Sequence, residues 1–183
     1  MTLTITPFDA PIGAEITGID LRNALDKSTV DEIYQAWLNH LVLIFRDQSL
    51  SKDEQVAFAN QFGEVGIRAT PKDVQNEVAN GYDGSIMLVT NQRDEKGNYI
   101  GSLQDGEMWF HHDTCYTPEP DKFTMLCALQ VPKTGGNTMW CNMYQAWETM
   151  PEGLKKTIRS KKALSVYDYA TIEKPDLDNL EKI

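Results

Sequence analysis

The residues with the clearest chemical potential are His111 and Asp113, which lie in the stretch Trp109-Phe110-His111-His112-Asp113. In a β-strand, residues i and i+2 point to the same face. On a strand, His111 and Asp113 would therefore reach one metal ion together, while His112 would point away from it. One imidazole and one carboxylate form two thirds of the 2-His-1-carboxylate site of non-haem Fe(II) oxygenases. The spacing thus points to an iron site.

Other chemistry fits the same residues less well. A histidine on a strand that merely hydrogen-bonds a nearby acid would give the same three letters, so the spacing by itself does not select iron. A cupin-like metal protein, which also uses a jelly roll, usually supplies clustered histidines, whereas this chain has 3 histidines in all. The 3 cysteines are an odd number without CxxC spacing, which argues against a disulfide framework and a zinc knuckle.

Composition sets the broad class. The chain has 183 residues, 41% hydrophobic and 24% charged, which suits one globular domain with a real core. A net charge of −10 disfavours nucleic acid as a partner, although a local pocket can still bind a small anion. The first residues have no basic segment followed by an apolar run, and no stretch approaches the ~20 apolar residues of a membrane span. We therefore expect a cytoplasmic protein without membrane partners.

The elements that must position these residues follow from periodicity. Residues 3–21 read as short strands broken by turns, and 41–45 as a buried strand. A helix should start near Ser28, with an apolar face of Val30, Ile33, Trp37 and Leu38. A second helix over 51–62 begins with a Ser51/Glu54 capping box. Later in the chain we expect strands at 86–90, 109–116, 123–130, 138–141 and 164–169, a helix at 145–159, and loops at 69–84 and 92–108.

Further motifs surround the His111/Asp113 pair in a fixed order. They are Ile12–Leu21 at the start, Phe45-Arg46-Asp47-Gln48, Phe62-Gly63-Glu64, and Pro132–Trp140 with its Gly-Gly-Asn-Thr turn. Each motif is unspecific, but the ordered set resembles the TauD/TfdA (taurine dioxygenase/2,4-D dioxygenase) family of Fe(II)/2-oxoglutarate-dependent dioxygenases. The resemblance covers nearly the whole chain.

The resemblance implies a fold and a domain organisation. The fold would be mainly β with flanking helices (α+β), built on the double-stranded β-helix, a jelly-roll variant. Residues 1–183 would form a single domain in three segments. These are N-terminal strands and helices (1–68), a loop-rich substrate-side segment (69–108) and the first part of the metal-binding core (109–183).

The resemblance also implies site residues and an activity. His111 and Asp113 would bind Fe(II), and the Thr138 hydroxyl would donate to a carboxylate of the co-substrate 2-oxoglutarate. The partners would be 2-oxoglutarate, O2 and a small organic substrate, which is hydroxylated as succinate and CO2 are released. Trp109 and Trp140 would line the core or a cavity. A homo-oligomer is compatible with this scheme.

The substrate side departs from taurine-type members, which place a histidine shortly after the Phe-Gly-Glu motif. This chain has Arg68 in the similar place, which counts against taurine itself. Arg68 fits either a bidentate contact to an anionic substrate or a solvated surface charge. Asn91 lies on the way to His111 and is a second candidate for substrate contact.

Two residues that the resemblance requires are missing. The family places a second iron histidine far downstream and an arginine for 2-oxoglutarate after it, yet no histidine follows His112. Arg159, the last arginine, lies on a predicted helix and does not match that motif. We therefore expect an N-terminal portion of such an enzyme, truncated at the C-terminus, with an incomplete jelly roll. The alternative function is a catalytically inactive fragment.

Overall fold

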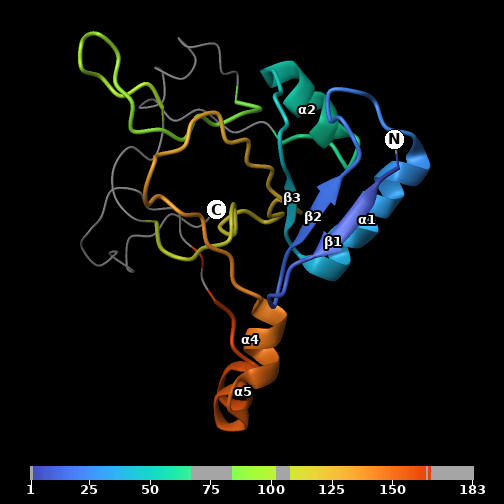
Figure 1. Ribbon diagram of the computed structural model, residues 1–183. Helices are drawn as coiled ribbons and strands as arrows, with labels where there is room; N and C mark the ends of the chain where they lie inside the picture. Colours follow the sequence, from blue (N-terminus) through green and yellow to red (C-terminus); the bar gives the residue numbers. More distant parts are fainter. Residues whose placement is uncertain (1, 67–83, 102–107, 164, 166–183) are drawn as a thin grey trace. The chain divides into compact units, whose positions relative to one another are not determined.

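The structure is a computed structural model that describes residues 2–66, 84–101, 108–163 and 165 (Figure 1). The chain divides into two compact units, which are described separately. Unit 1 comprises Met1–Trp109 and Cys127–Asn142, and unit 2 comprises Phe110–Leu126 and Met143–Ile183. No helix in the described part of the chain combines the length and apolar character that a bilayer crossing requires.

A three-stranded sheet organises unit 1, in the order β1-β2-β3. β1 (Thr4–Pro7) runs antiparallel to β2 (Ala14–Thr17), which confirms the strands predicted within 3–21. β2 runs parallel to β3 (Leu43–Phe45), and Ile16 pairs with Phe45. A parallel pair needs a long crossover connection, and here α1 supplies it. The strand predicted over 41–45 is thus shorter than expected, and it is half-buried.

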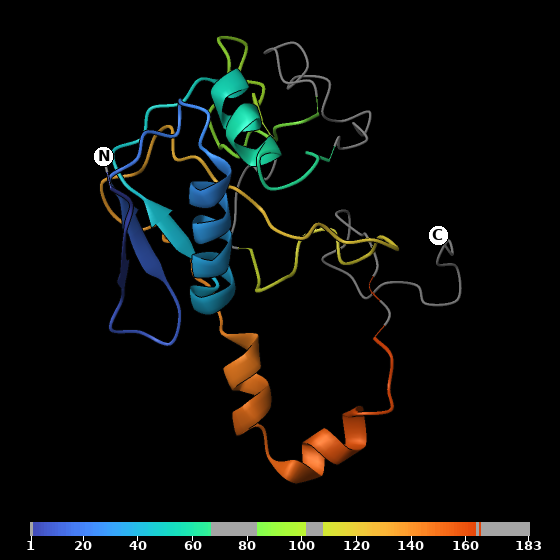
Figure 2. The ribbon, with the colours of Figure 1, turned by 90° about the vertical axis from the view of Figure 1, so that its right-hand side faces the viewer.

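Helix α1 (Lys27–His40) lies alongside the three strands (Figure 2). Its N-cap is Asp26, whose side chain accepts from the Thr29 N–H at 2.9 Å. Ile33 is buried as predicted, but Leu38 is 47% exposed. At 3.6 residues per turn, Leu38 falls about 140° round the helix from Ile33, which places it outside the buried stripe.

Helix α2 (Lys52–Asn60) begins with the predicted capping box. The Ser51 N–H donates to the Glu54 carboxylate at 2.8 Å, and the Glu54 N–H donates to the Ser51 hydroxyl at 3.3 Å. Phe58 on this helix is buried, and its ring packs edge-on against Phe45 of β3 with 5.7 Å between ring centroids. The Phe58–Phe45 contact therefore joins α2 to the sheet.

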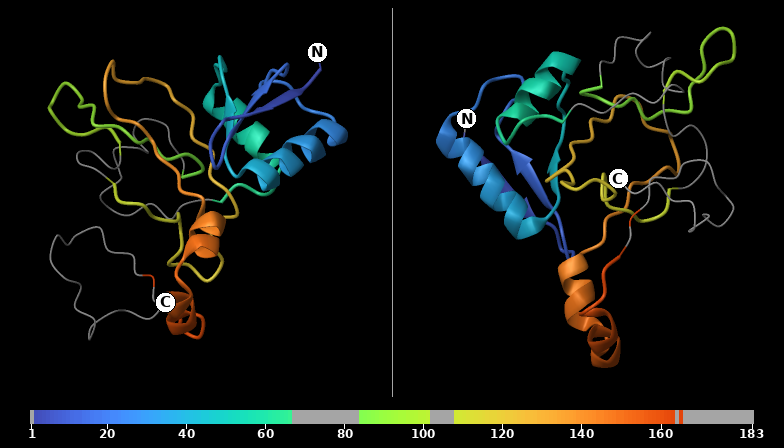
Figure 3. Two further views of the ribbon diagram at one scale, coloured as in Figure 1. Left: turned by 60° about the horizontal axis from the view of Figure 1, so that its bottom comes forward. Right: turned by 180° about the vertical axis from the view of Figure 1, so that it is seen from behind.

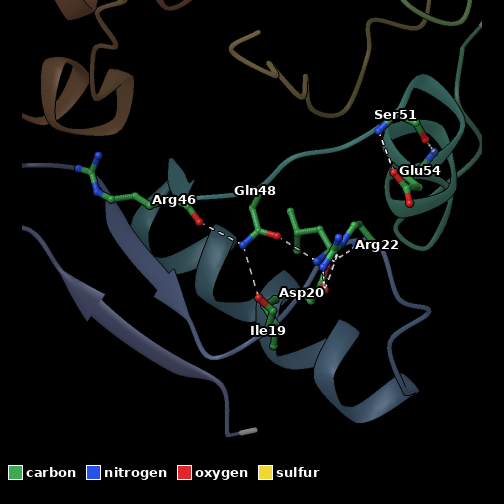
Figure 4. A network of polar contacts seen from close by, with 8 residues as sticks. Ile19, Asp20, Arg22, Arg46, Gln48, Ser51 and Glu54 are labelled. Atoms are coloured by element: carbon green, nitrogen blue, oxygen red, sulfur yellow. Dashed lines mark hydrogen bonds and ion pairs between the residues drawn. The ribbon is translucent and has the colours of Figure 1, made fainter.

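A polar network joins the segments that follow β2 and β3 (Figure 4). The Gln48 side chain accepts from the Leu21 N–H at 3.1 Å and donates to the carbonyls of Ile19 and Arg46 at 3.4 and 3.1 Å. The Arg22 side chain donates to both carboxylate oxygens of Asp20, with its Nη2 atom 2.6 Å from Oδ2 and its Nε atom 2.9 Å from Oδ1. The Gln48 contacts satisfy backbone groups that a sheet of three strands leaves unpaired.

The predicted strands at 86–90, 109–116, 123–130 and 138–141 are wrong, because no regular strand forms there. Residues 92–100, within the loop predicted at 92–108, form a tight loop with an isolated bridge between Arg93 and Tyr99. Apolar runs of strand length favour an extended chain, but a strand also needs a hydrogen-bonded neighbour. The described residues supply no such ladder for these segments. The strand predicted over 164–169 lies almost entirely outside the described residues.

The single helix predicted over 145–159 is two helices. α4 (Met143–Thr149) and α5 (Glu152–Ile158) follow one another with a bend between them (Figure 3). Pro151, the N-cap of α5, causes the break. Proline has no backbone N–H to donate, and it forces the preceding residue out of the helical region.

Large apolar side chains beyond residue 108 are widely exposed. Trp109 is 90% exposed and Trp140 is 51% exposed, so the prediction that they line the core or a cavity is wrong for this structure. In the described part of the chain, the flanking segments form no sheet that would cover these side chains. Among the described residues, the buried apolar side chains lie in the first part of the chain: Ala14, Ile16, Leu21, Ile33, Ala36 and Phe58.

Candidate metal centre

The side chains of His111 and Asp113 contact each other in unit 2. The Nε2 atom of His111 lies 3.0 Å from Oδ1 of Asp113, and both side chains are about half exposed. The predicted reason for this meeting, a shared strand face, is wrong, because residues 111–112 have no regular structure and 113–116 form a turn. His112 is also exposed, and the orientation of its side chain stays a prediction.

A tight turn after Asp113 shapes the pair. Thr114 has φ +52°, which is unusual for a β-branched residue. Its carbonyl accepts from both the N–H and the hydroxyl of Thr117 at 2.9 Å. Its own hydroxyl accepts from the Asp121 N–H at 2.7 Å. These hydrogen bonds offset the conformational cost of the positive φ at Thr114. They also direct the following chain back toward the Asp113 carboxylate.

The returning chain brings Thr124 to Asp113. The Thr124 hydroxyl donates to Oδ2 of Asp113 at 2.7 Å, while Oδ1 of the same carboxylate faces His111. Sequence reasoning missed Thr124. A threonine in a mostly apolar segment carries no signal of its own, and only the turn shows that it reaches a residue eleven positions earlier.

The spacing of the two donor atoms fits a shared metal ion. Two ligands at adjacent positions of an octahedral ion, each about 2.1 Å from the metal, lie about 3.0 Å apart. The Nε2–Oδ1 distance of 3.0 Å matches that separation. Imidazole and carboxylate together suit a first-row divalent ion such as Fe(II). In the part of the chain that the structure describes, no group of three or more His, Cys, Asp or Glu side chains is placed to hold a metal.

Two of the other predicted site residues belong to unit 1, and the third lies outside the described residues. Thr138 and Asn91 belong to unit 1, where both are exposed and lie outside helices and strands. Gly135 and Gly136, just before Thr138, have φ of +75° and +67°, which confirms the predicted glycine turn. Arg68 lies outside the described residues.

A shallow hollow of about 250 Å³ lies on α4 of unit 2, lined by Met143, Tyr144, Trp147 and Glu148. None of the predicted site residues lines it. Its walls are exposed side chains from one short helix, without a metal-ligating cluster. The hollow is therefore not a candidate metal site, and His111 and Asp113 stay the candidate centre.

Comparison with known proteins points the same way. The family described as "Taurine catabolism dioxygenase TauD, TfdA family" matches residues 4–179. Pentalenolactone F synthase from Streptomyces avermitilis is 34% identical over 165 residues, which cover 89% of this chain and 52% of that protein. The (S)-phenoxypropionate/alpha-ketoglutarate-dioxygenase of Sphingobium herbicidovorans is 30% identical over 167 residues, covering 91% of this chain and 54% of that protein. The chain thus spans about half the length of these relatives.

A solved structure extends the likeness to the fold. The crystal structure of AAD-2 in complex with Mn(II) and N-oxalylglycine aligns with a TM-score of 0.59 and 25% sequence identity. The alignment covers 86% of this chain and 49% of that chain. The two therefore share their fold over the matched part.

Proposed function

Because this chain belongs to the taurine catabolism dioxygenase TauD, TfdA family, we propose that it is part of an Fe(II)- and 2-oxoglutarate-dependent dioxygenase. The enzyme hydroxylates a small anionic organic substrate. The observation that supports the proposal is the approach of His111 Nε2 to Asp113 Oδ1 at 3.0 Å, a separation that fits two ligands of one ion as well as a hydrogen bond from the imidazole to the carboxylate. The naming of a relative as a phenoxypropionate/alpha-ketoglutarate-dioxygenase supports the class of substrate and co-substrate.

Each proposed site residue has one task. His111 binds Fe(II) through the lone pair of Nε2, and Asp113 binds it through Oδ1. The bound iron supplies the activation of O2 that couples decarboxylation of 2-oxoglutarate to hydroxylation of the substrate. The Thr138 hydroxyl donates to a 2-oxoglutarate carboxylate, and Arg68 and Asn91 contact the substrate. A charged donor such as Arg68 suits an anion.

We further propose that both units belong to one domain whose core is the double-stranded β-helix. The family match supports this, because it runs from residue 4 to 179 and so crosses both units. The exposed Trp109 and Trp140 are also consistent with it, since such side chains normally lie under a second layer. In this arrangement, a further layer of the domain would cover these two side chains.

A second candidate function is metal binding without turnover. No histidine follows His112 in the 183 residues, and the described part of the chain offers two metal-ligating side chains at the pair. Two ligands hold an ion more weakly than three, and the resemblance assigns the 2-oxoglutarate arginine to a position that these residues do not supply. On this reading the chain binds the ion but forms no succinate.

One experiment separates these functions. The full-length protein that contains these 183 residues is incubated in air with Fe(II), ascorbate, 2-oxoglutarate and a panel of aryloxy acids, sulfate esters and sulfonates. The 183-residue protein is treated in the same way, and succinate is measured in both. A dioxygenase forms succinate, and His111→Ala and Asp113→Ala each lower the rate at least tenfold. His112→Ala is the matched control and keeps the rate.

The same variants then report metal binding by anaerobic titration with Co(II). Binding that depends on His111 and Asp113 without succinate selects the second function. Binding that is equal in all four proteins rejects the pair as a metal centre.

A further inference from the structure

The two oxygens of the Asp113 carboxylate have different surroundings. Oδ1 faces Nε2 of His111 at 3.0 Å, and Oδ2 accepts from the Thr124 hydroxyl at 2.7 Å. A hydrogen bond to an ionised carboxylate is stronger than one between neutral groups, and 2.7 Å is short. The hydroxyl therefore distinguishes one oxygen from the other.

Asp113 needs such a contact. Rotation about the terminal torsion of an aspartate is broad and roughly two-fold, so either oxygen can take either position. The side chain is 46% exposed, so packing does not hold the carboxylate plane. The hydrogen bond from the Thr124 hydroxyl is therefore the contact that holds Oδ2 in place.

We propose that Thr124 is a positioning residue of the metal centre, which holds Asp113 so that Oδ1 alone is presented to the ion. The inference rests on the proposed function and deepens it. With Oδ2 engaged by the hydroxyl, the carboxylate binds the metal through one oxygen. Coordination positions that a two-oxygen contact would take then stay open for the co-substrate and O2.

The turn that delivers Thr124 does not depend on its hydroxyl. Thr114 closes the turn through the Thr117 N–H and hydroxyl and the Asp121 N–H, at 2.9, 2.9 and 2.7 Å. Thr124 itself is exposed, so its side chain contributes little burial. Loss of this hydroxyl should therefore change the carboxylate and leave the turn in place.

The test compares Thr124→Val, which keeps the shape and removes the hydroxyl, with Thr124→Ser, which keeps the hydroxyl. Thr149→Val is the matched control, because the Thr149 hydroxyl donates to the Gln145 carbonyl at 2.8 Å on α4, outside the centre. Each protein is titrated anaerobically with Co(II), and the visible absorption of the bound ion reports its coordination. The thermal unfolding midpoint of each metal-free protein is followed by circular dichroism.

We expect Thr124→Val to weaken Co(II) binding about 10- to 100-fold, as removal of a partner of a metal ligand typically does, and to alter the visible spectrum. Thr124→Ser and Thr149→Val should match the parent in both readouts, and all unfolding midpoints should agree. Parent-like affinity and spectrum in Thr124→Val, with Asp113→Ala deficient, would overturn the role of Thr124 alone. If Asp113→Ala also bound like the parent, the proposed centre itself would be rejected, and this inference with it.

Discussion

Nε2 of His111 lies 3.0 Å from Oδ1 of Asp113, and the two side chains are 48% and 46% exposed. Exposed ion pairs contribute little to stability, because water and salt screen them. We therefore expect His111→Gln and Asp113→Asn to leave the metal-free free energy of unfolding within about 0.5 kcal/mol of the parent. Urea unfolding followed by circular dichroism measures this.

Added metal should stabilise the parent against unfolding but not these two variants. A ligand that binds only the folded state stabilises it by about 2.7 kcal/mol at a hundred times its Kd. We expect Co(II) to raise the unfolding midpoint of the parent and of His112→Ala, and not that of the two variants. A large loss of metal-free stability in either variant would instead identify the pair as a structural contact.

Local signals predicted the first part of the chain well. The Ser51/Glu54 box is contained within three residues, and its two hydrogen bonds are present. The helix from Ser28 and the strands within 3–21 rest on similarly short patterns, and all of them form. Contacts between distant residues carry no such signal. Nothing in the letters indicates that Gln48 accepts from the Leu21 N–H, or that Thr124 reaches Asp113.

The strands predicted from residue 86 onward do not form, for a different physical reason. The apolar run over 123–130 is compatible with a strand, but it does not specify the neighbour that a strand requires. At Pro151 a purely local signal, the missing N–H of proline, overrides the helical periodicity that predicts one helix over 145–159. The pairing of His111 with Asp113 was expected from strand geometry and arises instead from a turn at Thr114.

The Asp20–Arg22 contact should make stability depend on acid pH. The hydrogen bonds from the Arg22 side chain and backbone N–H lower the pKa of Asp20 from 3.8 to about 2. A carboxyl with a depressed folded-state pKa stabilises the fold above its unfolded pKa, and this contribution is lost as pH falls through the folded value. We expect Asp20→Asn to have a lower thermal midpoint than the parent at pH 7.

The difference between Asp20→Asn and the parent should shrink between about pH 4 and pH 2, where the parent carboxylate takes up its proton. Midpoints from circular dichroism at closely spaced pH values measure this. Arg22→Gln is the control, because it removes the Arg22 side-chain hydrogen bonds, the largest cause of the low pKa, and keeps the backbone N–H. In that background, the difference between Asp20→Asn and the parent should depend less on pH. A gap that stays constant down to pH 2 would contradict the assignment.

Ser51 should stabilise α2 through its cap. Its side chain accepts from the Glu54 N–H, which otherwise has no partner in the first turn of the helix. We expect Ser51→Ala to lower the free energy of unfolding by about 1 kcal/mol, and Ser51→Asp to restore most of it, because aspartate also caps well. Chemical denaturation of the three proteins gives both values. Equal stability of Ser51→Ala and the parent would show that the cap contributes nothing.

Phe58 should be the most sensitive side chain of the small core. It is 5% exposed and packs against the rings of Phe45 and Phe62, with centroid separations of 5.7 and 5.2 Å. Truncating a buried phenylalanine removes the transfer free energy and leaves a cavity, so Phe58→Ala should cost about 3–5 kcal/mol. Phe58→Leu keeps most of the volume and should cost about 1 kcal/mol, which keeps the measurement possible if the alanine variant unfolds.

Phe8→Ala is the matched control, because Phe8 is 36% exposed and should lose much less. The comparison decides whether α2 is held to the sheet by the Phe58–Phe45 contact. The polar bonds of Gln48 reach only the backbone of residues 19, 21 and 46, so they do not substitute for this apolar contact. If Phe8→Ala and Phe58→Ala lower the free energy of unfolding by the same amount, the contact between Phe58 and Phe45 is not what holds α2 to the sheet. The burial of Phe58 would then contribute no more to stability than the half-exposed Phe8.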